Sequence, residues 1–282
     1  MIKTSLLLTL ALSLTPFALF ANDDAQSEGR KLMDQYVATQ TVDSELAFIE
    51  LKTFETETPT DEIIKKRFIA VTEKTGNGTY DYLIRMVRPL DVEGVSVLTN
   101  VDGAVVEQYL FLPAQGKPLK LSSAGSGNFL GSDFAYEDLI RETPGNYEYT
   151  RLPDGVAQGE ICAVVQAIPT DAGASQYAYR KLYLDPDTFE VRRIEFFNEL
   201  DGEAVKELQA YEYRSPDIEG STVRPRFAVM TNLETGTISV FKVLKSRLNL
   251  DVDSKLFEAD QLASVSEADV NGLLVEIDEM GQ

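Results

Sequence analysis

The sequence predicts a mainly β protein, α+β in class, built on one antiparallel sheet of about eleven strands. Short runs in which apolar and polar residues alternate recur over most of the chain, as in strands that bury one face. Short turn sequences join nearly all of these runs, so neighbours in sequence are expected to be antiparallel neighbours in space. A sheet of that many strands has to split into a sandwich or curl toward a barrel.

The elements follow in order along the chain. An amphipathic helix is expected at 25–39, where apolar residues recur at helical spacing. The expected strands are 44–54, 66–74, 79–87, 94–101, 105–113, 146–152, 159–168, 176–184, 190–198, 205–213, 224–233 and 237–248. Glycine, asparagine and aspartate predict turns at 75–78, 102–103, 154–155, 185–187, 201–202 and 234–236.

The strand faces favour curling over a sandwich. In 79–87 one face carries Tyr80, Tyr82, Ile84 and Met86, while the other face is mostly polar. The segments that could cover an apolar concave face are the N-terminal helix, 134–140 and, weakly, the tail at 266–280. With so few helices, either the sheet curls tightly onto itself or part of its apolar lining stays available for a ligand.

The N-terminal sequence predicts a secretory signal peptide, residues 1–21. Lys3 supplies the positive start, and an uncharged, leucine-rich run ends at Ala21. This run is shorter than a membrane-spanning helix requires, and no cysteine lies near it to carry a lipid anchor. The mature chain is expected to be exported and to form one domain, 22–262, followed by a tail, 263–282, that can form a short helix.

Composition disfavours several classes of function. With 26 basic and 46 acidic residues the formal net charge is −20, so the phosphate backbone of a nucleic acid would be repelled. The chain has no histidine, which removes the usual general base and the usual zinc ligand. The single cysteine, Cys162, lies in an apolar run and is expected to be a buried, inert thiol. We therefore expect no catalytic residue, no metal and no cofactor, although chemistry based on carboxylates or lysine stays open.

The stretch GSDFAYEDL, residues 131–139, interrupts the alternation. Ser132 or Asp133 could cap a helix whose first turn carries acidic residues near the positive end of the helix dipole. Phe134, Leu139 and Tyr136 would then face the sheet. The alternative, a catalytic acid pair, needs two carboxylates that face each other across a substrate, whereas here they share one short segment.

The same stretch carries a resemblance to a known family. FLGSDFAYEDL, with QYLFLP and KPLKLSS before it and RKLYLDPDTFEVRRIEFFN and VRPRFAVMTNLETG after it, resembles the LolA-like outer-membrane lipoprotein-sorting family. In particular it resembles the longer branch often found beside RND-type exporters, over about residues 26–262. The resemblance implies an unclosed antiparallel β-barrel of about eleven strands, with helices covering its mouth and a hydrophobic cavity for acyl chains.

The resemblance also implies a function. The chain would be a periplasmic carrier that holds the acyl chains of a lipid or lipoprotein for transfer towards the outer membrane, together with an exporter or an outer-membrane acceptor. Phe134 and Tyr136 would form its lid, and Arg67 or Arg85 could replace the arginine that latches the lid in the family. The tryptophan-containing strand of the dedicated lipoprotein carrier is absent, since the chain has no tryptophan. The expected cavity lining is Phe68, Tyr82, Ile84, Met86, Leu98, Leu110, Leu112, Ile194 and Phe196, each of which could equally be ordinary core.

Two other classes of function stay open. The first is a periplasmic interaction module of an RND-type exporter that docks through the acidic surface and carries no cargo of its own. The second is an enzyme that uses carboxylates.

Overall fold

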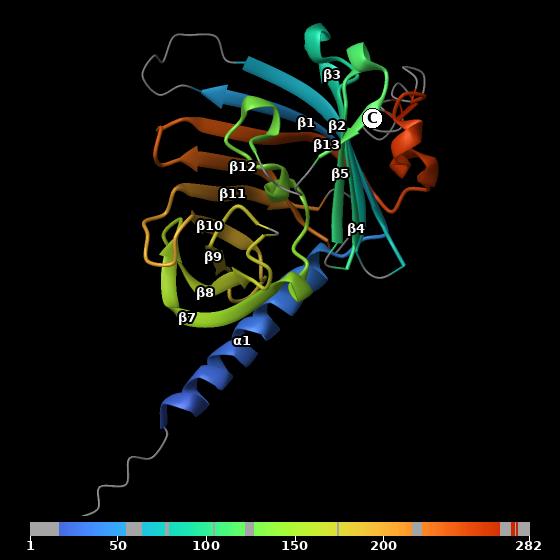
Figure 1. Cartoon of the computed structure of the whole chain (residues 1–282). Coiled ribbons are helices and arrows are strands. Elements are labelled where there is room, and N and C mark those ends of the chain that lie inside the picture. Colours follow the sequence, from blue (N-terminus) through green and yellow to red (C-terminus); the bar gives the residue numbers. More distant parts are fainter. Residues whose placement is uncertain are drawn as a thin grey trace, which may run out of the picture.

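The computed structural model describes residues 17–54, 64–76, 79–103, 105–121, 127–173, 175–215, 222–265, 272–273 and 275, and these form one curled sheet with one long helix beside it (Figure 1). The helix is α1 (Phe17–Gln40). The strands are β1 (Ser44–Phe54), β2 (Ile64–Lys74), β3 (Tyr80–Arg88), β4 (Ser96–Asp102), β5 (Val105–Phe111), β6 (Pro118–Lys120), β7 (Tyr147–Ala157), β8 (Glu160–Pro169), β9 (Tyr179–Leu184), β10 (Val191–Phe197), β11 (Lys206–Arg214), β12 (Arg224–Asn232) and β13 (Ile238–Leu248). Short 3₁₀ helices are η1 (Leu90–Val92), η2 (Pro113–Gln115), η3 (Phe129–Gly131), η4 (Tyr136–Leu139), η5 (Pro144–Asn146), η6 (Ser254–Phe257) and η7 (Ala259–Gln261).

The sheet is built from two antiparallel meanders, and the first strand of the chain, β1, lies inside the sheet and not at its edge. Within the described residues its thirteen strands run in the order β6-β5-β4-β3-β2-β1-β13-β12-β11-β10-β9-β8-β7, and the neighbours are antiparallel. The chain proceeds from β1 to the edge strand β6, crosses to the other edge strand, β7, and returns strand by strand to β13. There β13 pairs with β1. The edges β6 and β7 do not pair with each other, so the barrel is unclosed.

The described part of the crossing from β6 to β7 that begins at residue 127 lies inside the curve of the sheet, where Figure 1 shows it in green. We call residues 127–140 of this connection the plug. It contains η3 and η4 instead of a long helix. Leu130 has a φ of 49° and Gly131 a φ of 74°, two successive left-handed residues that end η3. The plug therefore depends for its shape on contacts with the sheet around it.

Helix α1 lies against the β7 end of the sheet. Met33 is fully buried there with Tyr149 of β7 and Val165 of β8. Gly29 permits the close approach, because a Cβ atom at this position would lie 2.8 Å from the backbone nitrogen of Arg151. The predicted helix is confirmed and begins earlier, at Phe17. Residues 1–16 of the expected signal peptide lie outside the described residues, and no helix within the described part is long and apolar enough to cross a membrane.

The outer face of β1 to β5 is covered by the segment after β13. Phe257 and Leu262 of this segment pack on one apolar side chain from each of the five strands, and Asn100 Nδ2 donates a hydrogen bond of 3.1 Å to the carbonyl of Phe257. Figure 1 shows this segment, in red, outside the sheet. The expectation that the outer face of 79–87 is mostly polar is therefore wrong at Leu83, which is buried under this cover. Most of the predicted tail at 263–282 lies outside the described residues.

The predicted turn at 154–155 is wrong. β7 continues to Ala157 with a bulge between Leu152 and Gly155, and the chain reverses at Gln158 and Gly159. A Cβ atom on Gly155 would lie 2.7 Å from Cε1 of Tyr183, so this glycine permits close packing across the sheet and does not form a turn. The described part also holds more strands than about eleven, partly because the short β6 carries no alternation signal.

We expect Gly29→Ala to destabilise the fold. Alanine in a helix interior normally stabilises by about 1 kcal/mol relative to glycine, but here its methyl group would meet the backbone of β7. Urea unfolding measures whether the free energy of unfolding falls or rises in this variant. Gly145→Ala is the control, since a Cβ there would have no atom within 4 Å. A stabilised Gly29→Ala variant would show that α1 is not packed closely on β7.

Candidate functional site

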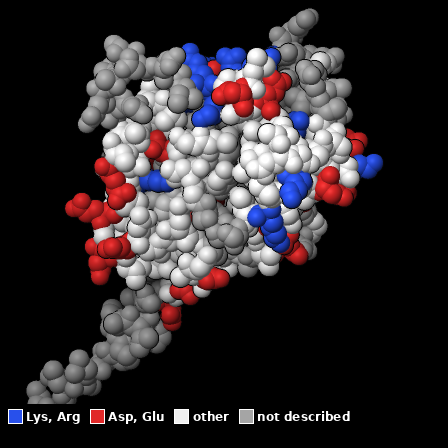
Figure 2. All heavy atoms as spheres, turned by 45° about the horizontal axis from the view of Figure 1, so that its top comes forward, with Lys and Arg blue, Asp and Glu red and all other residues white. Residues whose placement is uncertain are grey.

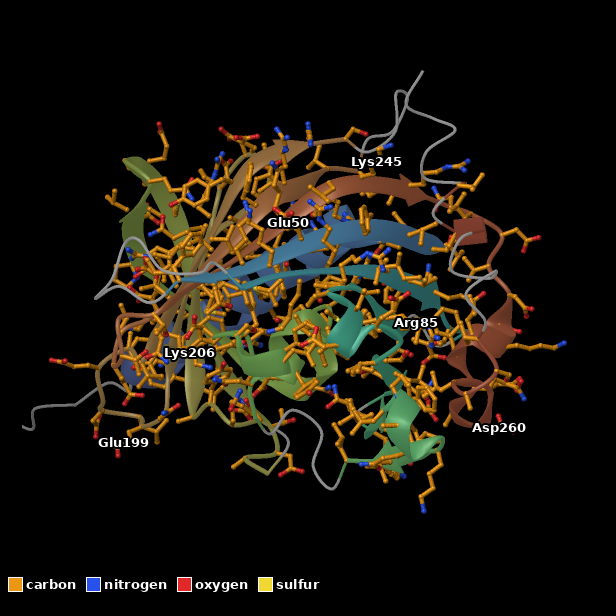
Figure 3. The ribbon with its side chains drawn as sticks, turned by 90° about the horizontal axis from the view of Figure 1, so that it is seen from above. Glu50, Arg85, Glu199, Lys206, Lys245 and Asp260 are labelled. Carbon is orange, nitrogen blue, oxygen red and sulfur yellow. The ribbon has the colours of Figure 1, made fainter. Side chains whose placement is uncertain are left out.

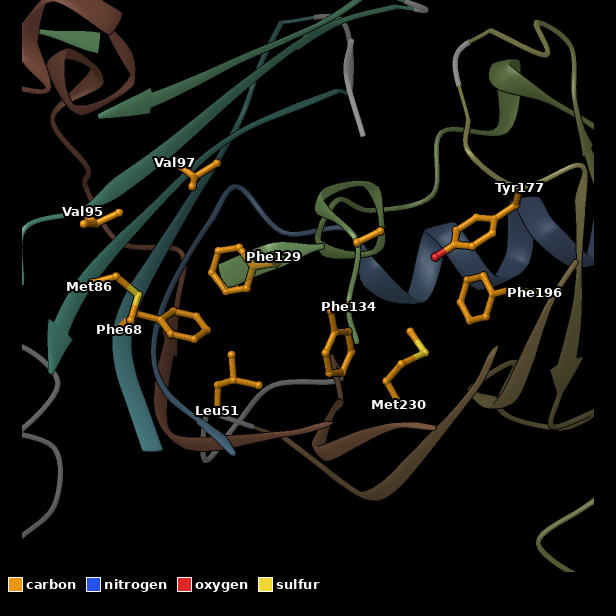
Figure 4. Close-up of a cluster of buried hydrophobic side chains, with 11 residues drawn as sticks. Leu51, Phe68, Met86, Val95, Val97, Phe129, Phe134, Tyr177, Phe196 and Met230 are labelled. Carbon is orange, nitrogen blue, oxygen red and sulfur yellow. The ribbon is translucent and has the colours of Figure 1, made fainter. Parts of the chain in front are cut away.

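The concave face of the sheet holds the largest apolar cluster, drawn in Figure 4. Strands from both halves of the sheet contribute to it, so the cluster spans the whole curve. Its buried members are Leu51, Phe68, Met86, Val95, Val97, Phe129, Phe134, Ala135, Tyr177, Phe196 and Met230. Phe129, Phe134 and Ala135 belong to the plug. In Figure 4 the two phenylalanines lie between side chains from the two halves of the sheet, which we call its walls. The inner face is thus lined by the sheet and filled by the plug.

Aromatic contacts hold the plug in this position. Phe134 stacks on Phe241 of β13 with ring centroids 3.9 Å apart and an interplanar angle of 17°. Phe129 meets Phe68 of β2 edge to face at 5.7 Å. Such pairs contribute about 0.5–1.5 kcal/mol each beyond the burial of their area.

Hydrogen bonds also hold the plug against the sheet. The carboxylate of the buried Asp133 accepts hydrogen bonds from the hydroxyls of Thr237 and Ser239 at 2.5 and 2.6 Å, and the hydroxyl of Ser239 accepts one from the amide of Asp133. Lys66 Nζ donates to the carbonyl of Leu130 at 2.7 Å. Lys66 therefore attaches η3 to β2, and Asp133 attaches the segment after η3 to β13.

Two further plug carboxylates face the segment before β9. Glu137 accepts from the hydroxyl of Ser175 at 2.8 Å and from the amide of Gln176 at 2.9 Å. Asp138 accepts from the hydroxyl of Tyr177 at 3.1 Å and from the amide of Ala135 at 2.7 Å. Burial raises the pKa of both carboxyl groups, that of Asp138 to about 6, and nearby Glu137 raises the pKa of Asp138 further.

A cavity of about 90 Å³ lies where α1 ends. Tyr36, Tyr80, Tyr82 and Arg141 are among the residues that line it. The carbonyl of Gln40, at the end of α1, accepts hydrogen bonds from the guanidinium groups of Arg141 and Arg224. Both arginines also bind Glu45 of β1, so they fix the C-terminus of α1 to the sheet and satisfy its last carbonyl.

Comparison with known proteins agrees with this architecture. A protein-family model described as an uncharacterized protein family matches residues 78–264, more than half of the chain. The chain belongs to that family, and it has the LolA-like fold. No curated protein gives a match.

Three solved structures share the LolA-like fold with it. An outer membrane lipoprotein-sorting protein domain from Vibrio parahaemolyticus is 24% identical, with a TM-score of 0.76 over 84% of this chain and 99% of that chain. A DUF1329 family protein from Desulfovibrio piger is 19% identical, with a TM-score of 0.75 over 84% of this chain and 99% of that one. A LolA superfamily protein from Nitrosomonas europaea is 19% identical, with a TM-score of 0.65 over 82% of this chain and 98% of that one. The predicted fold class and the resemblance to the family are confirmed.

The LolA-like fold brings most of the predicted lining residues onto one face. The members of this group in the concave cluster or packed against it are Phe68, Ile84, Met86, Leu110, Leu112, Ile194 and Phe196, together with the expected lid residues Phe134 and Tyr136. Tyr82 shares that face but lies at its end, in a cluster with Tyr80 and Val101, and its hydroxyl accepts from the amide of Arg141. Whether any of them contacts a ligand stays a prediction.

Leu98 is the exception, because it points to the outer face. It is fully buried there, in the cluster that Phe257 and Leu262 cover. Neighbouring residues of a strand alternate in direction, so Val97 takes the inward position on β4.

The expected helix caps are wrong as well. Ser132 Oγ donates to the carbonyl of Phe129, and Asp133 binds β13 instead of a helix N-terminus. η4 begins after Ala135, whose amide is bound by the Asp138 side chain. The partners of Asp133 lie more than a hundred residues away in sequence, so a local pattern could not reveal them.

The expected latch arginines have partners outside the plug. Arg67 pairs with Glu50 at 2.9 Å, and Arg85 donates to the carbonyl of Val265 on the outer face, where Figure 3 shows it beside the C-terminal segment. Lys66 makes the bond to a plug carbonyl.

The expectation about the cysteine is confirmed. Cys162 is buried, as predicted, and burial raises the pKa of its thiol, which keeps it a poor nucleophile. Among the described residues no group of three or more cysteine, aspartate or glutamate side chains is placed to hold a metal ion.

We expect Asp133→Ala to loosen the plug and leave the sheet intact. Hydrogen bonds to a charged group contribute about 1.5–3 kcal/mol each, so amide exchange in the plug should accelerate about tenfold or more, read at the amide of Phe129, which donates to the carbonyl of Phe134. Exchange of the sheet amides should not change. Asp187→Asn, at an exposed turn, is the control, and equal protection in both variants would contradict the anchoring role.

The raised pKa of Asp138 predicts a dependence of stability on pH. Its folded pKa of about 6 exceeds its ordinary value of 3.8, so its protonated form stabilises the fold below about pH 4, and this contribution is lost as the pH rises through 6. Urea unfolding between pH 4 and 7 should therefore show a steeper loss of stability in the wild type than in Asp138→Asn. Lys206, Glu137 and Tyr177 face this carboxylate and remain in both proteins. Parallel profiles would contradict the prediction.

Proposed function

We propose that this protein is a periplasmic carrier that holds the acyl chains of a lipid or lipoprotein on its concave face and transfers them towards the outer membrane, and that it has no enzymatic activity. The observation that carries the proposal is the LolA-like sheet with its inner apolar cluster. The proposed route is export through a signal peptide at 1–21. An RND-type exporter or an outer-membrane acceptor is the proposed partner.

In this proposal the plug leaves the concave face when cargo enters. Full burial of a large apolar side chain contributes about 1.5–3 kcal/mol, so Phe129 and Phe134 together represent about 3–6 kcal/mol. A chain of about sixteen carbons regains on the order of 10 kcal/mol when it leaves water, at about 0.8 kcal/mol per methylene. Burial of the acyl chain can therefore compensate for the free energy of burial that is lost when Phe129 and Phe134 leave. Without cargo, the plug covers the apolar concave face.

The filled concave face also supports a second candidate, an interaction module of an RND-type exporter with no cargo of its own. In the described structure the walls and the plug pack on each other, as in an ordinary core. Figure 2 shows acidic side chains gathered on one flank of the molecule, which suits docking to a basic partner. The two candidates differ in whether the plug has to move.

A disulfide that holds the plug closed distinguishes them. Asp133 and Ser239 contact each other through backbone and side chain, so Asp133→Cys with Ser239→Cys, in a Cys162→Ala background, can form a bond between the plug and β13. We expect the oxidised protein to lose binding of a fluorescent fatty-acyl probe and the reduced protein to regain it. Mass spectrometry of the wild type should detect bound lipid.

The reduced form of the same variant and the Cys162→Ala protein are the controls. Equal binding in the oxidised and reduced forms would show that acyl chains do not use the space under the plug. A wild type free of lipid that also ignores the acyl probe would favour the docking module.

A further inference from the structure

Lys206 places a buried cation on the concave face. It is 9% exposed and stands directly opposite Phe196 of β10, so it shares the inward face of the sheet with that ring. Figure 3 shows it beside the plug. Its ammonium has two neutral partners at the limit of hydrogen-bond distance, Asn128 Oδ1 at 3.4 Å and the Tyr177 hydroxyl at 3.5 Å. Among the described residues no carboxylate oxygen lies within the 4.0 Å of an ion pair with it.

Three hydrogen-bond donors of the segment before β9 point at plug carboxylates, and the positive charge of Lys206 acts on both of these carboxylates. The donors are the Ser175 hydroxyl, the Gln176 amide and the Tyr177 hydroxyl, which bind Glu137 and Asp138. In Figure 4 the hydroxyl of Tyr177 is directed towards the plug. The segment before β9 and the start of β11 thus form a site for negative charge, which the protein's own side chains fill in this structure.

The site lies at the border of the apolar cluster. The ring of Tyr177 packs on Phe196 with centroids 4.7 Å apart, and Met230 belongs to the same cluster. Leu208 follows Lys206 at the next inward position of β11. A molecule that enters under the plug would therefore meet hydrocarbon along most of its length and positive charge at one end.

From this arrangement we propose that Lys206, with Ser175, Gln176 and Tyr177, forms a binding site for the anionic head of an acyl ligand, a carboxylate or a phosphate. Glu137 and Asp138 occupy the site while the plug is closed. The inference rests on the proposed carrier function and adds the chemical class of the cargo.

Displacement of the plug explains why the head has to be anionic. When Glu137 and Asp138 leave, the Lys206 ammonium and the hydrogen-bond donors around it remain in an apolar setting without a negatively charged acceptor, which costs free energy unless another anion enters. A carboxylate or phosphate restores these bonds and brings the opposite charge, whereas an alcohol supplies one neutral oxygen. The ionised plug carboxylates themselves bear a cost of burial, which the raised pKa values reflect, and this cost is relieved when the plug leaves.

Binding of four probes that share a twelve-carbon chain tests the site. Dodecanoate, dodecyl phosphate, dodecanol and dodecyltrimethylammonium are titrated into the full-length mature protein by calorimetry. We expect both anions to bind more tightly than dodecanol and the cation to bind most weakly. Lys206→Met should weaken the two anions about tenfold to a hundredfold, since a hydrogen bond to a charged group contributes about 1.5–3 kcal/mol, and should leave dodecanol unchanged.

Two further variants keep the test decisive. Tyr177→Phe removes one hydroxyl and should weaken the anions less than Lys206→Met does, with the fold intact. Lys242→Met is the matched control, because Lys242 follows the inward-facing Phe241 on β13 and so points to the outer face, where its ammonium lies 5.6 Å from the ring centre of Phe227.

The outcomes separate the two proposals. Equal affinity for dodecanoate and dodecanol, unchanged in Lys206→Met, would overturn the anion site and leave the carrier function standing. Failure of all four probes to bind would overturn both. A preference for anions that Lys206→Met abolishes and Lys242→Met retains would establish the site.

Discussion

The fold depends on one constraint: the two edges of the sheet, β6 and β7, are consecutive in the chain. The connection between them has to travel from one edge to the other, and the shortest path lies across the inside of the curve. An apolar concave face needs a cover, and the crossing segment supplies it with Phe129, Phe134 and Ala135. One covalent connection therefore holds the two half-sheets together in sequence and fills the space between them.

The plug is attached by two different kinds of contact. Phenylalanine rings fill the apolar centre, while Asp133, Glu137 and Asp138 reach hydrogen-bond donors at its margins. The aromatic contacts have little directional requirement, so an acyl chain can take their place. The polar contacts need acceptors in defined positions, which makes them the part of the site that can select a ligand.

The sequence predicts the sheet well, because alternation and turn residues are local signals. β1 occupies the predicted residues 44–54, and most later strands shift by only a few residues at their ends. The errors arise where a distant partner decides the outcome. The sequence pattern predicts a turn at Gly155, but this glycine is needed for close packing against Tyr183 of β9. The pattern also predicts that Leu98 faces inward, but this side chain lies on the outer face, under Phe257.

The candidate site was less accessible from sequence. The stretch 131–139 stands out, but its partners in β13 and before β9 lie 38 residues away or more. A usable signal existed at Lys206, which shares the inward face of its strand with Leu208 and so places a charge among apolar positions. The interaction with the plug could not be read from that pattern, because it depends on the crossing segment.

The pairing of β1 with β13 also determines the order in which the molecule can assemble. All other neighbouring strands in the sheet are neighbours in sequence and can form as local ladders, while this seam joins Glu45 to Leu248. A chain that emerges from its N-terminus presents β1 long before β13 exists, with one row of backbone hydrogen-bond donors and acceptors unsatisfied. Until β13 is synthesised, the nascent protein consists of two half-sheets, and β1 is an exposed edge strand. Truncation before residue 238 would make that exposed edge permanent and leave a template for aggregation.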